Sequence, residues 1–356
     1  MNSASDLDYQ AKILPGVSRT FALTIPVLPG VLARVVTNAY LLCRLADTIE
    51  DDVALNDAQK TEFHARFVRV VQGEEPAEPF ASDLAPLLSD RTLADERDLV
   101  RNTAKVIRIT HAFSDAQRQA LTNCVTIMCD GMPRFQRNKS SGGLPALRDL
   151  DEYCYFVAGV VGEMLTELFL LHCPSLEPQR QRMLELAVSF GQGLQMTNIL
   201  KDIWDDQLAD TCWLPRAVFE RHGFNLDSLK LAHDSESFAA GLDELIGIAH
   251  AHLKNALEYS CIIPKSEPGI RKFCLWALGL AVLTLRKIHA NPSFASGSEV
   301  KVSRRTVKAT VLSTNLALKS DRALRFLFNR AAAGIPFQAS DLSLVRPSYG
   351  PASEVS

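Results

Sequence analysis

Hydrophobic residues recur at helical spacing along most of the chain, whereas the alternation typical of half-buried β-strands is scarce. This periodicity predicts an all-α protein whose amphipathic helices turn their apolar faces inward. The segments with the clearest helical spacing are 32–45, 121–132, 153–171, 182–204, 238–257, 272–288 and 307–328.

Turn-forming residues separate these segments. Clusters of Gly, Pro and Ser predict loops at 73–79, 139–145 and 264–268, and an irregular chain from Gly334 on. No internal repeat and no change in composition marks a boundary between domains. We therefore expect one helical domain over residues 1–335 and an irregular C-terminal tail over residues 336–356.

Composition excludes some classes of protein. The chain has 356 residues, of which 47% are hydrophobic, and this is enough for a large core. Its formal net charge of -3 gives no positive field for gripping nucleic acid, so we expect no nucleic-acid partner. The eight cysteines form no CxxC pair and no Cys/His cluster at zinc spacing, which favours reduced thiols and a cytoplasmic location.

Nothing in the sequence predicts a segment that crosses a membrane. The first residues lack the basic and apolar regions of a secretory signal. The longest strongly apolar run, 273–285, is shorter than the roughly 20 residues that span a bilayer, and we interpret it as a buried helix. The C-terminal tail carries no apolar anchor either.

The first candidate chemistry is a carboxylate cluster at 47–52 (DTIEDD), at the end of an apolar helical segment. Asp47 and Asp51 are four residues apart and therefore share one face of a helix. Two like charges there are unfavourable unless a cation lies between them, and hard cations such as Mg²⁺ prefer oxygen ligands. One such motif alone is more often a solvated helix end.

A second polar row changes that balance. Asn198, Asp202 and Asp206 follow one another every four residues, and Gln195 extends the same side by a turn. Carboxylates on a mostly apolar helix are costly unless their charge is matched. Two such helices facing each other across a cavity would hold several Mg²⁺ ions, which would clamp a diphosphate and help it to leave. The apolar remainder of the cavity would receive a prenyl chain.

With these motifs the sequence resembles the squalene/phytoene synthase family from about residue 18 to about residue 308. The matching stretches are 18–21 (SRTF), Tyr40 with Arg44, 47–52 (DTIEDD), 153–162 (YCYFVAGVVG) and 195–202 (QMTNILKD). Both DTIEDD and YCYFVAGVVG are more similar to squalene synthases than to phytoene synthases. The same holds for Phe273-Cys274 at the opening of an apolar helix and for the basic stretch 300–305.

The resemblance implies one α-helical domain with the isoprenoid (prenyl) synthase fold around a central cavity. It implies a Mg²⁺-dependent prenyltransferase, with Mn²⁺ as the alternative metal. Two farnesyl diphosphates would be joined head to head to presqualene diphosphate, and NADPH would then deliver a hydride to give squalene, a precursor of sterols or hopanoids.

The resemblance also implies the roles of individual residues. The expected metal ligands are Asp47, Asp51, Asn198, Asp202 and Asp206, and Tyr153 is expected to handle the proton lost in cyclopropane closure. The residues expected at the substrate are Ser18, Arg19, Phe21, Tyr40, Arg44, Gln195, Asn198 and Phe273. Lys301 and Arg304 are expected to hold the phosphates of NADPH.

Several of these residues also have a structural interpretation that needs no ligand. The alternatives are a helix cap for Ser18, core aromatic packing for Phe21, Tyr153 and Phe273, an ion pair within the helix for Arg44, and a solvated basic surface for Lys301 and Arg304. No GxGxxG motif follows a strand, so a nicotinamide site would have to be built from the helical cavity itself.

The sequence departs from the family pattern at two positions. Thr211 stands where relatives commonly carry an arginine shortly before an aromatic-Leu-Pro element, which here is Trp213-Leu214-Pro215. One contact to diphosphate or cofactor is therefore missing or replaced. Lys201 stands where many relatives carry arginine, which keeps the charge and loses the fork geometry.

Two alternatives to a squalene synthase remain open at this point. The enzyme could release presqualene diphosphate, or form dehydrosqualene or phytoene without hydride transfer. The length of the pocket decides between C15 and C20 substrates, and the sequence does not reveal that length. A non-enzymatic scaffold with the same fold is disfavoured because both carboxylate clusters are intact. Since substrate and product are very apolar, we expect transient contact with a membrane surface; the oligomeric state is not predicted.

Overall fold

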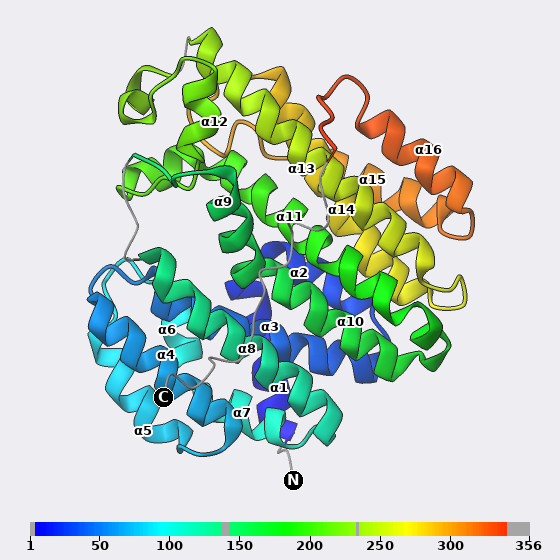
Figure 1. Ribbon diagram of the computed structural model, residues 1–356. Helices are drawn as coiled ribbons and strands as arrows, with labels where there is room; N and C mark the ends of the chain where they lie inside the picture. The colour runs from blue at the N-terminus through cyan, green and yellow to red at the C-terminus, as the bar shows by residue number, and fades with distance from the viewer. Residues whose placement is uncertain (1–3, 137–141, 233–234, 340–356) are drawn as a thin grey trace, which may run out of the picture.

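The computed structural model describes residues 4–136, 142–232 and 235–339, and helices make up nearly all of this chain (Figure 1). No β-strand occurs in these ranges, and the only bridge recorded there joins Leu144 to Pro215. The prediction of an all-α protein is confirmed. The first half comprises α1 (Ala4–Val17), α2 (Arg19–Thr24), η1 (Ile25–Val27), α3 (Gly30–Asp51), α4 (Asp57–Gln72), α5 (Ala77–Leu84), η2 (Ala85–Leu87), α6 (Ala94–Arg101), α7 (Thr103–His111) and α8 (Asp115–Gln136).

The second half carries the longest helices. It comprises α9 (Leu147–Cys154), the π-helix η3 (Tyr155–Gly159), α10 (Val160–His172), η4 (Pro174–Gln179), α11 (Arg180–Leu208), α12 (Arg216–Arg221), η5 (Leu226–Leu231), α13 (Glu236–Ile262), α14 (Pro268–Ala290), α15 (Arg304–Ala317) and α16 (Asp321–Ala331). Helices α10, α13 and α14 all pack against α11, which makes α11 the central element of this half.

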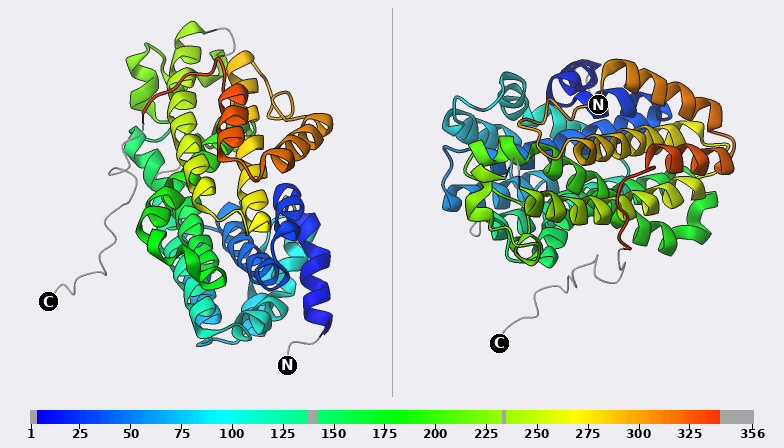
Figure 2. Two further views of the ribbon diagram at one scale, coloured as in Figure 1. Left: turned by 90° about the vertical axis from the view of Figure 1, so that its right-hand side faces the viewer. Right: turned by 90° about the horizontal axis from the view of Figure 1, so that it is seen from above.

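The views in Figures 1 and 2 agree on the arrangement of the two halves. Helices α1–α8 gather at one end of the molecule, α12–α16 lie at the other, and α9–α11 run between them. One continuous hydrophobic cluster extends from Ile13 in α1 to Ile335 after α16, so the two halves share a core.

The predicted helical segments correspond to real helices with two exceptions. Segment 153–171 is interrupted by the π-helix η3, where the wider turn inserts a residue relative to α-helical spacing. Segment 307–328 is two helices, α15 and α16, because Ser320 begins a new helix and its hydroxyl accepts a hydrogen bond from the backbone N–H of Ala323.

The predicted loops are mostly confirmed. The loop at 73–79 is shorter than predicted, since α5 already begins at Ala77, and α14 likewise begins at Pro268, the last residue of the loop predicted at 264–268. Part of the predicted loop at 139–145 and of the predicted tail at 336–356 lies outside the described residues; positions 336–339 of the tail are irregular.

Close packing of α11 against η3 and α10 depends on glycine. A Cβ at Gly162 would lie 2.3 Å from the carbonyl oxygen of Ala187, and a Cβ at Gly191 would lie 2.2 Å from the carbonyl oxygen of Ala158. Since backbone atoms cannot move aside as a flexible side chain can, the two glycines allow two backbones to touch. This contact fixes the distance between the helices that wall the central cavity.

Two stretches are long and apolar enough to cross a membrane by length and composition, Leu147–His172 and Pro268–Ala290. More than half of each stretch is buried inside the protein, as in the core helices of many folded domains. The run 273–285 lies within α14 and is buried there, as predicted.

The start of α14 is held by a buried arginine. Arg271 is fully buried; its Nη1 donates a hydrogen bond to the carbonyl of Ile263 (2.7 Å) and its Nη2 to Asp321 Oδ1 of α16 (2.5 Å). The pair joins the C-terminal hairpin α15–α16 to the helix that carries Phe273.

Candidate active site

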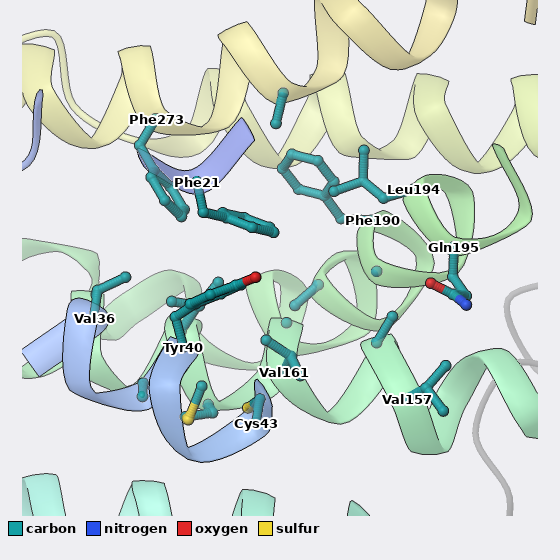
Figure 3. Close-up of a pocket in the computed structure, with 18 of the residues that line it drawn as sticks. Phe21, Val36, Tyr40, Cys43, Val157, Val161, Phe190, Leu194, Gln195 and Phe273 are labelled. Atoms are coloured by element: carbon teal, nitrogen blue, oxygen red, sulfur yellow. The ribbon is translucent and has the colours of Figure 1, made fainter. Parts of the chain in front are cut away.

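A cavity of about 250 Å³ lies where α3, η3, α10, α11 and α14 meet. Its wall is mostly apolar, and its polar side chains are few. Figure 3 shows the rings of Phe21, Tyr40 and Phe273 gathered on one side and the amide of Gln195 on the other. A ligand with a long apolar part and a small polar head fits such a distribution.

The aromatic side of the cavity is built by residues from four helices, α2, α3, α10 and α14. The Phe21 ring lies 5.2 Å from Tyr40 and 6.4 Å from Phe273, measured between ring centroids, and Phe273 in turn meets Phe169 edge-on at 6.1 Å. Phe21 and Phe273 are thus packed as core aromatics and exposed to the cavity at once. Ring faces on a cavity wall attract cations, including a carbocation formed nearby.

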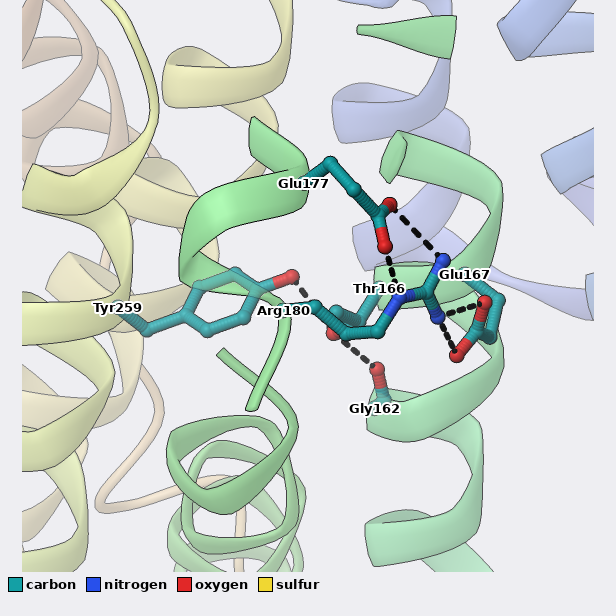
Figure 4. A network of polar contacts seen from close by, with 6 residues as sticks. All are labelled: Gly162, Thr166, Glu167, Glu177, Arg180 and Tyr259. Atoms are coloured by element: carbon teal, nitrogen blue, oxygen red, sulfur yellow. Dashed lines mark hydrogen bonds and ion pairs between the residues drawn. The ribbon is translucent and has the colours of Figure 1, made fainter. Parts of the chain in front are cut away.

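A hydrogen-bonded network between α10 and α13 also braces the cavity wall (Figure 4). The Thr166 hydroxyl donates to the carbonyl of Gly162 (2.9 Å), so the hydroxyl of Tyr259, at 2.9 Å, donates to Thr166. The ring of Tyr259 therefore faces the cavity. Burial raises the pKa of its phenol well above the ordinary value. Beside this network, Arg180 ties Glu167 of α10 to Glu177 of η4.

Arg44 and Tyr40 stand one turn apart on α3 and both line the cavity. The Tyr40 hydroxyl donates to the carbonyl of Val17 (2.8 Å) and accepts from Arg44 Nη2 (3.2 Å). Arg44 Nη1 lies 3.6 Å from Glu96 of α6. The structure therefore pairs Arg44 with a carboxylate on another helix, and its Nε is buried without a hydrogen-bond partner.

Asp47 lies one turn beyond Arg44 and also lines the cavity. Removal from water raises the pKa of Asp47 to about 7; Arg44 opposes this rise, and the carboxylates of Asp51 and Glu96 add to it. Asp51 is the last residue of α3 and is exposed. The first motif thus places one carboxylate, Asp47, in the cavity lining and a second, Asp51, one turn further along α3, in a field that favours an added cation.

The second motif lies on α11 across the cavity. Gln195 and Asn198 line the cavity, and Asp202 follows one turn later, with Lys201 Nζ 2.9 Å from its Oδ2. Burial raises the pKa of Asp202, and Lys201 counteracts it. Asp206, two turns beyond Asn198, is half-buried. The cavity therefore brings together Asp47, Gln195 and Asn198, while Asp51, Asp202 and Asp206 lie outside its lining.

In the described chain no three His, Cys, Asp or Glu side chains converge closely enough to hold one metal ion by themselves. The donor set nevertheless fits Mg²⁺, because it consists of carboxylate and amide oxygens and Mg²⁺ keeps substrate phosphates and waters in its shell. The raised pKa of Asp47 supports the fit, since a desolvated carboxyl near like charges gains from a cation.

Tyr153 lies beside the cavity and is not part of its lining. It is 9% exposed, with its ring stacked on Trp213 and edge-on to Phe135. Burial and then the carboxylates of Asp51 and Glu50 raise the pKa of Tyr153 well above its ordinary value. The phenol is therefore packed as a core residue and yet lies in the field of the first carboxylate motif.

Ser18 caps helix α2, as its sequence position predicted: its Oγ accepts a hydrogen bond from the backbone N–H of Phe21 (3.0 Å). The cap positions Phe21, the next turn, at the cavity. Arg19 begins α2, and its side chain lies outside the described part of the structure.

Lys301 lies near the end of the loop between α14 and α15, and Arg304 is the first residue of α15, where this loop ends; both are exposed. The carbonyl of Lys301 accepts a hydrogen bond from Lys287 Nζ (2.7 Å). Earlier in this loop, a Cβ at Gly297 would lie 2.9 Å from Asp202 Oδ1. The loop that carries the two basic residues therefore passes directly against the second carboxylate motif.

The chain turns sharply after α11. Asp210 has a φ of 53°, in the left-handed region that Asp tolerates better than most residues, and the carbonyl of Asp206 accepts the N–H groups of Ala209 and Thr211. Thr211 is buried, with its hydroxyl bonded to the carbonyl of Ala209 (3.2 Å). Thr211 therefore serves the turn that leads to Trp213.

Sequence reasoning missed several residues of the site, among them Phe169 and Tyr259 of the cavity wall and the two contact residues Trp213 and Glu96. Trp213 belongs to the aromatic-Leu-Pro element already singled out, and only the fold reveals that it meets Tyr153. Glu96 lies in a charged stretch that resembles any solvated helix, and no pattern in the sequence marks its contact with Arg44.

Comparison with known proteins gives one consistent result. The family profile of squalene/phytoene synthase matches residues 14–306. A squalene synthase of Botryococcus braunii is 29% identical over 328 residues, which cover 87% of this chain and 65% of that protein. The chain thus spans somewhat less than two thirds of the length of that relative.

Two solved structures share the fold. A complex of TcSQS with the ligand BPH1237 superposes with a TM-score of 0.72 and 23% identity, covering 96% of this chain and 95% of the other. A dehydrosqualene synthase in complex with a ligand superposes with a TM-score of 0.66 and 21% identity, covering 89% and 97%. The helical isoprenoid synthase fold is thereby confirmed, and with the match over residues 14–306 the chain belongs to the squalene/phytoene synthase family.

Proposed function

We propose that this protein joins two farnesyl diphosphates head to head to presqualene diphosphate and then, with NADPH as hydride donor, converts this intermediate to squalene. The observation that carries the proposal is the cavity, whose apolar and aromatic walls run into a polar end formed by Arg44, Asp47, Gln195 and Asn198. A prenyl diphosphate has the same division into a long apolar chain and a compact anionic head.

The two carboxylate motifs would hold Mg²⁺ through Asp47, Asp51, Asn198, Asp202 and Asp206. Bound there, Mg²⁺ would neutralise the diphosphate and make it a better leaving group. Arg44 would bind diphosphate oxygens directly: it lines the cavity, Tyr40 and Glu96 hold its guanidinium in place, and its buried Nε has a proton to donate. Ser18 and Arg19 begin α2 beside this end of the cavity and are candidates for further contacts.

The aromatic side would serve the carbocation. When the allylic C–O bond breaks, positive charge develops on the prenyl chain, and the faces of Phe21 and Phe273 can stabilise it without reacting with it. The apolar walls exclude water, which would otherwise capture the cation as an alcohol.

Tyr153 would handle the proton lost in cyclopropane closure. Its raised pKa keeps the phenol neutral, and a neutral phenol is a weak base, so it would give its own proton to a diphosphate oxygen as it accepts one from the substrate. The stack on Trp213 holds the phenol in one orientation for this step.

Lys301 and Arg304 would bind the phosphates of NADPH. The support is the loop that carries them, because it passes against Asp202 at Gly297 and so borders the metal end of the cavity. The affinity for a dinucleotide would come from this exposed basic edge, with the nicotinamide reaching inward.

The test is an incubation of purified protein with farnesyl diphosphate and Mg²⁺, with and without NADPH. Products are separated by gas chromatography–mass spectrometry after phosphatase treatment. Squalene that appears only with NADPH is the expected result. Presqualene diphosphate or dehydrosqualene irrespective of NADPH would instead assign a synthase without hydride transfer, and no turnover of farnesyl or geranylgeranyl diphosphate would favour a scaffold.

A further inference from the structure

The hairpin of α15 and α16 packs on α14 with one side and turns its other side away from the protein. The inward residues, among them Thr310, Thr314, Leu324 and Phe328, line a groove of about 290 Å³ against α14. On α15 the exposed residues away from this groove include Arg305, Lys308, Leu312 and Leu316, which follow one another at intervals of three or four.

Large apolar side chains are exposed on the outward side. The side chains of Leu312 and Leu316 are 61% and 81% exposed, and Phe326 of α16 is 64% exposed. Isolated exposed leucines are common on protein surfaces, but here three lie on two adjoining short helices. None of them contributes to the core beneath.

Cations flank each of these apolar residues. On α16, Arg322 lies one turn before Phe326. Lys308 on α15 and Lys319, two residues after α15 ends, flank the two leucines. Residues 304–331 contain seven Lys or Arg and one acidic residue, Asp321, a net charge of +6 in a chain whose formal net charge is -3. The hairpin is therefore a basic region of a protein whose remaining residues carry a net negative charge.

We propose that the outward side of α15–α16 docks the protein on an anionic phospholipid bilayer. Leu312, Leu316 and Phe326 would enter the boundary between headgroups and acyl chains, and the flanking lysines and arginines would pair with lipid phosphates. Charge complementarity alone would also suit a nucleic acid, but a polyanion in water offers no apolar layer for three exposed hydrophobic side chains.

The docking follows from the surface and needs no catalytic activity. Its use rests on the proposed function: a hydrocarbon product without a polar group can leave only into an apolar phase. Helix α14 separates the groove under the hairpin from the central cavity, with Phe273 and Cys274 on one side and Leu275 and Leu278 on the other. Docking through this hairpin would bring α14 and the cavity behind it close to the bilayer.

The experiment is co-sedimentation of the full chain with vesicles of phosphatidylcholine alone and of phosphatidylcholine mixed with phosphatidylglycerol. We expect at least about tenfold stronger binding to the anionic vesicles, weakened by salt. Leu312→Ser/Leu316→Ser/Phe326→Ser and Lys308→Gln/Arg322→Gln should each reduce that binding about tenfold. The control Val31→Ser/Leu93→Ser removes two equally exposed apolar side chains elsewhere and should bind like the parent.

Circular dichroism of each variant checks that the fold is retained. Equal vesicle binding by the parent and the triple variant would overturn the proposal, as would an equal loss in the control. Self-association of the parent that the triple variant abolishes, measured by light scattering without lipid, would assign the surface to a second copy of the chain. Since sedimentation needs no substrate, absence of turnover would leave this result unaffected.

Discussion

The ring of Tyr153 lies flat against the indole of Trp213, with 3.9 Å between ring centroids and 8° between ring planes. Tyr153 comes from α9 and Trp213 from the turn after α11, so the stack joins the helix before the π-helix to the helix that carries the second carboxylate motif. An aromatic pair of this kind contributes about 0.5–1.5 kcal/mol beyond its buried area.

Replacing Trp213 by leucine should release Tyr153 from its orientation. Because small misplacements of a catalytic group are costly, we expect Trp213→Leu to lower kcat for presqualene diphosphate about 10- to 100-fold, with little change in KM. Trp213→Phe retains a flat ring and should keep most of the activity. Steady-state kinetics with farnesyl diphosphate measures both.

Phe135→Leu is the matched control for that experiment, since it removes the edge-on neighbour of Tyr153 and leaves the stack. Full activity in Tyr153→Phe would show that the phenol has no part in proton handling, and an equal loss in Trp213→Phe and Trp213→Leu would argue against positioning by stacking.

The carboxylate motifs should carry metal dependence. Asp47→Asn and Asp202→Asn should each lower product formation at least about 100-fold, because metal-borne charge stabilisation amounts to several kcal/mol. Mg²⁺ with inorganic pyrophosphate should raise the Tm of the parent and fail to do so for either variant.

Asp205→Asn is the control for position on the helix, since Asp205 is exposed and lies off the row formed by Asn198, Asp202 and Asp206. If Asp205→Asn lost as much activity as Asp202→Asn, general acidity of this helix end would explain the data better than specific metal ligands.

Reduction should depend on the basic residues of the loop after α14. In Lys301→Ala/Arg304→Ala we expect squalene to fall at least about tenfold while presqualene diphosphate accumulates, because the loss of phosphate contacts affects only the step that uses NADPH. Arg305→Ala changes the neighbouring charge and should leave the product ratio unchanged. A proportional loss of both products would contradict a role confined to the cofactor.

The ion pair of Arg271 with Asp321 should make the free energy of unfolding depend on pH in the acidic range. Burial alone would raise the pKa of Asp321, but the hydrogen bond and charge of Arg271, together with Lys265, hold this pKa below the ordinary value of an aspartic acid. A carboxyl with a lowered pKa stabilises the fold above its unfolded pKa, and this contribution is lost as the pH falls through the folded value.

Asp321→Asn should therefore lower the free energy of unfolding at pH 7 by about 1.5–3 kcal/mol, the range for a hydrogen bond to a charged group. The difference from the parent should shrink as the pH falls below about 4. Thermal unfolding across this pH range measures it, and a difference that is the same at all pH values would mean that the ion pair is not its source.

The glycine contacts between α10, η3 and α11 should not tolerate a methyl group. Gly162→Ala would place its Cβ 2.3 Å from the carbonyl oxygen of Ala187, and we expect a loss of about 1–3 kcal/mol in the free energy of unfolding. Gly30→Ala, at the start of α3 with no atom within 4 Å of the added Cβ, should be neutral or stabilise by up to about 1 kcal/mol. Urea denaturation measures the change in the free energy of unfolding for both variants. Similar changes would mean that the helix propensity of alanine, and not the contact at Gly162, determines the effect.

Helix spacing and motif order were enough to predict the class, the fold family and most long helices, because amphipathic periodicity is a local property of the chain. The π-helix at Tyr155–Gly159 was missed because its residues are as apolar as those of an α-helix, and the wider turn is set by contact with α11. The break at Ser320 was missed because its flanking segments share one hydrophobic period.

At the candidate site, too, local features could be predicted and contacts between distant residues could not. Asp47 and Asn198 could be named from spacing on their own helices, whereas Glu96 and Trp213 act through partners more than 50 residues away in the chain. Such pairings arise from the way helices pack, and a single sequence contains no period that encodes them.

The left-handed turn at Asp210 sets a fixed length between Asp206 and Trp213. The chain leaves α11, reverses within a few residues and delivers an indole to a tyrosine on another helix, so one residue more or fewer would rotate that indole away from its partner. We therefore expect insertions and deletions to be excluded from 207–212. The spacing of this short connection, as much as the identity of its residues, is what a designer altering the protein would have to preserve.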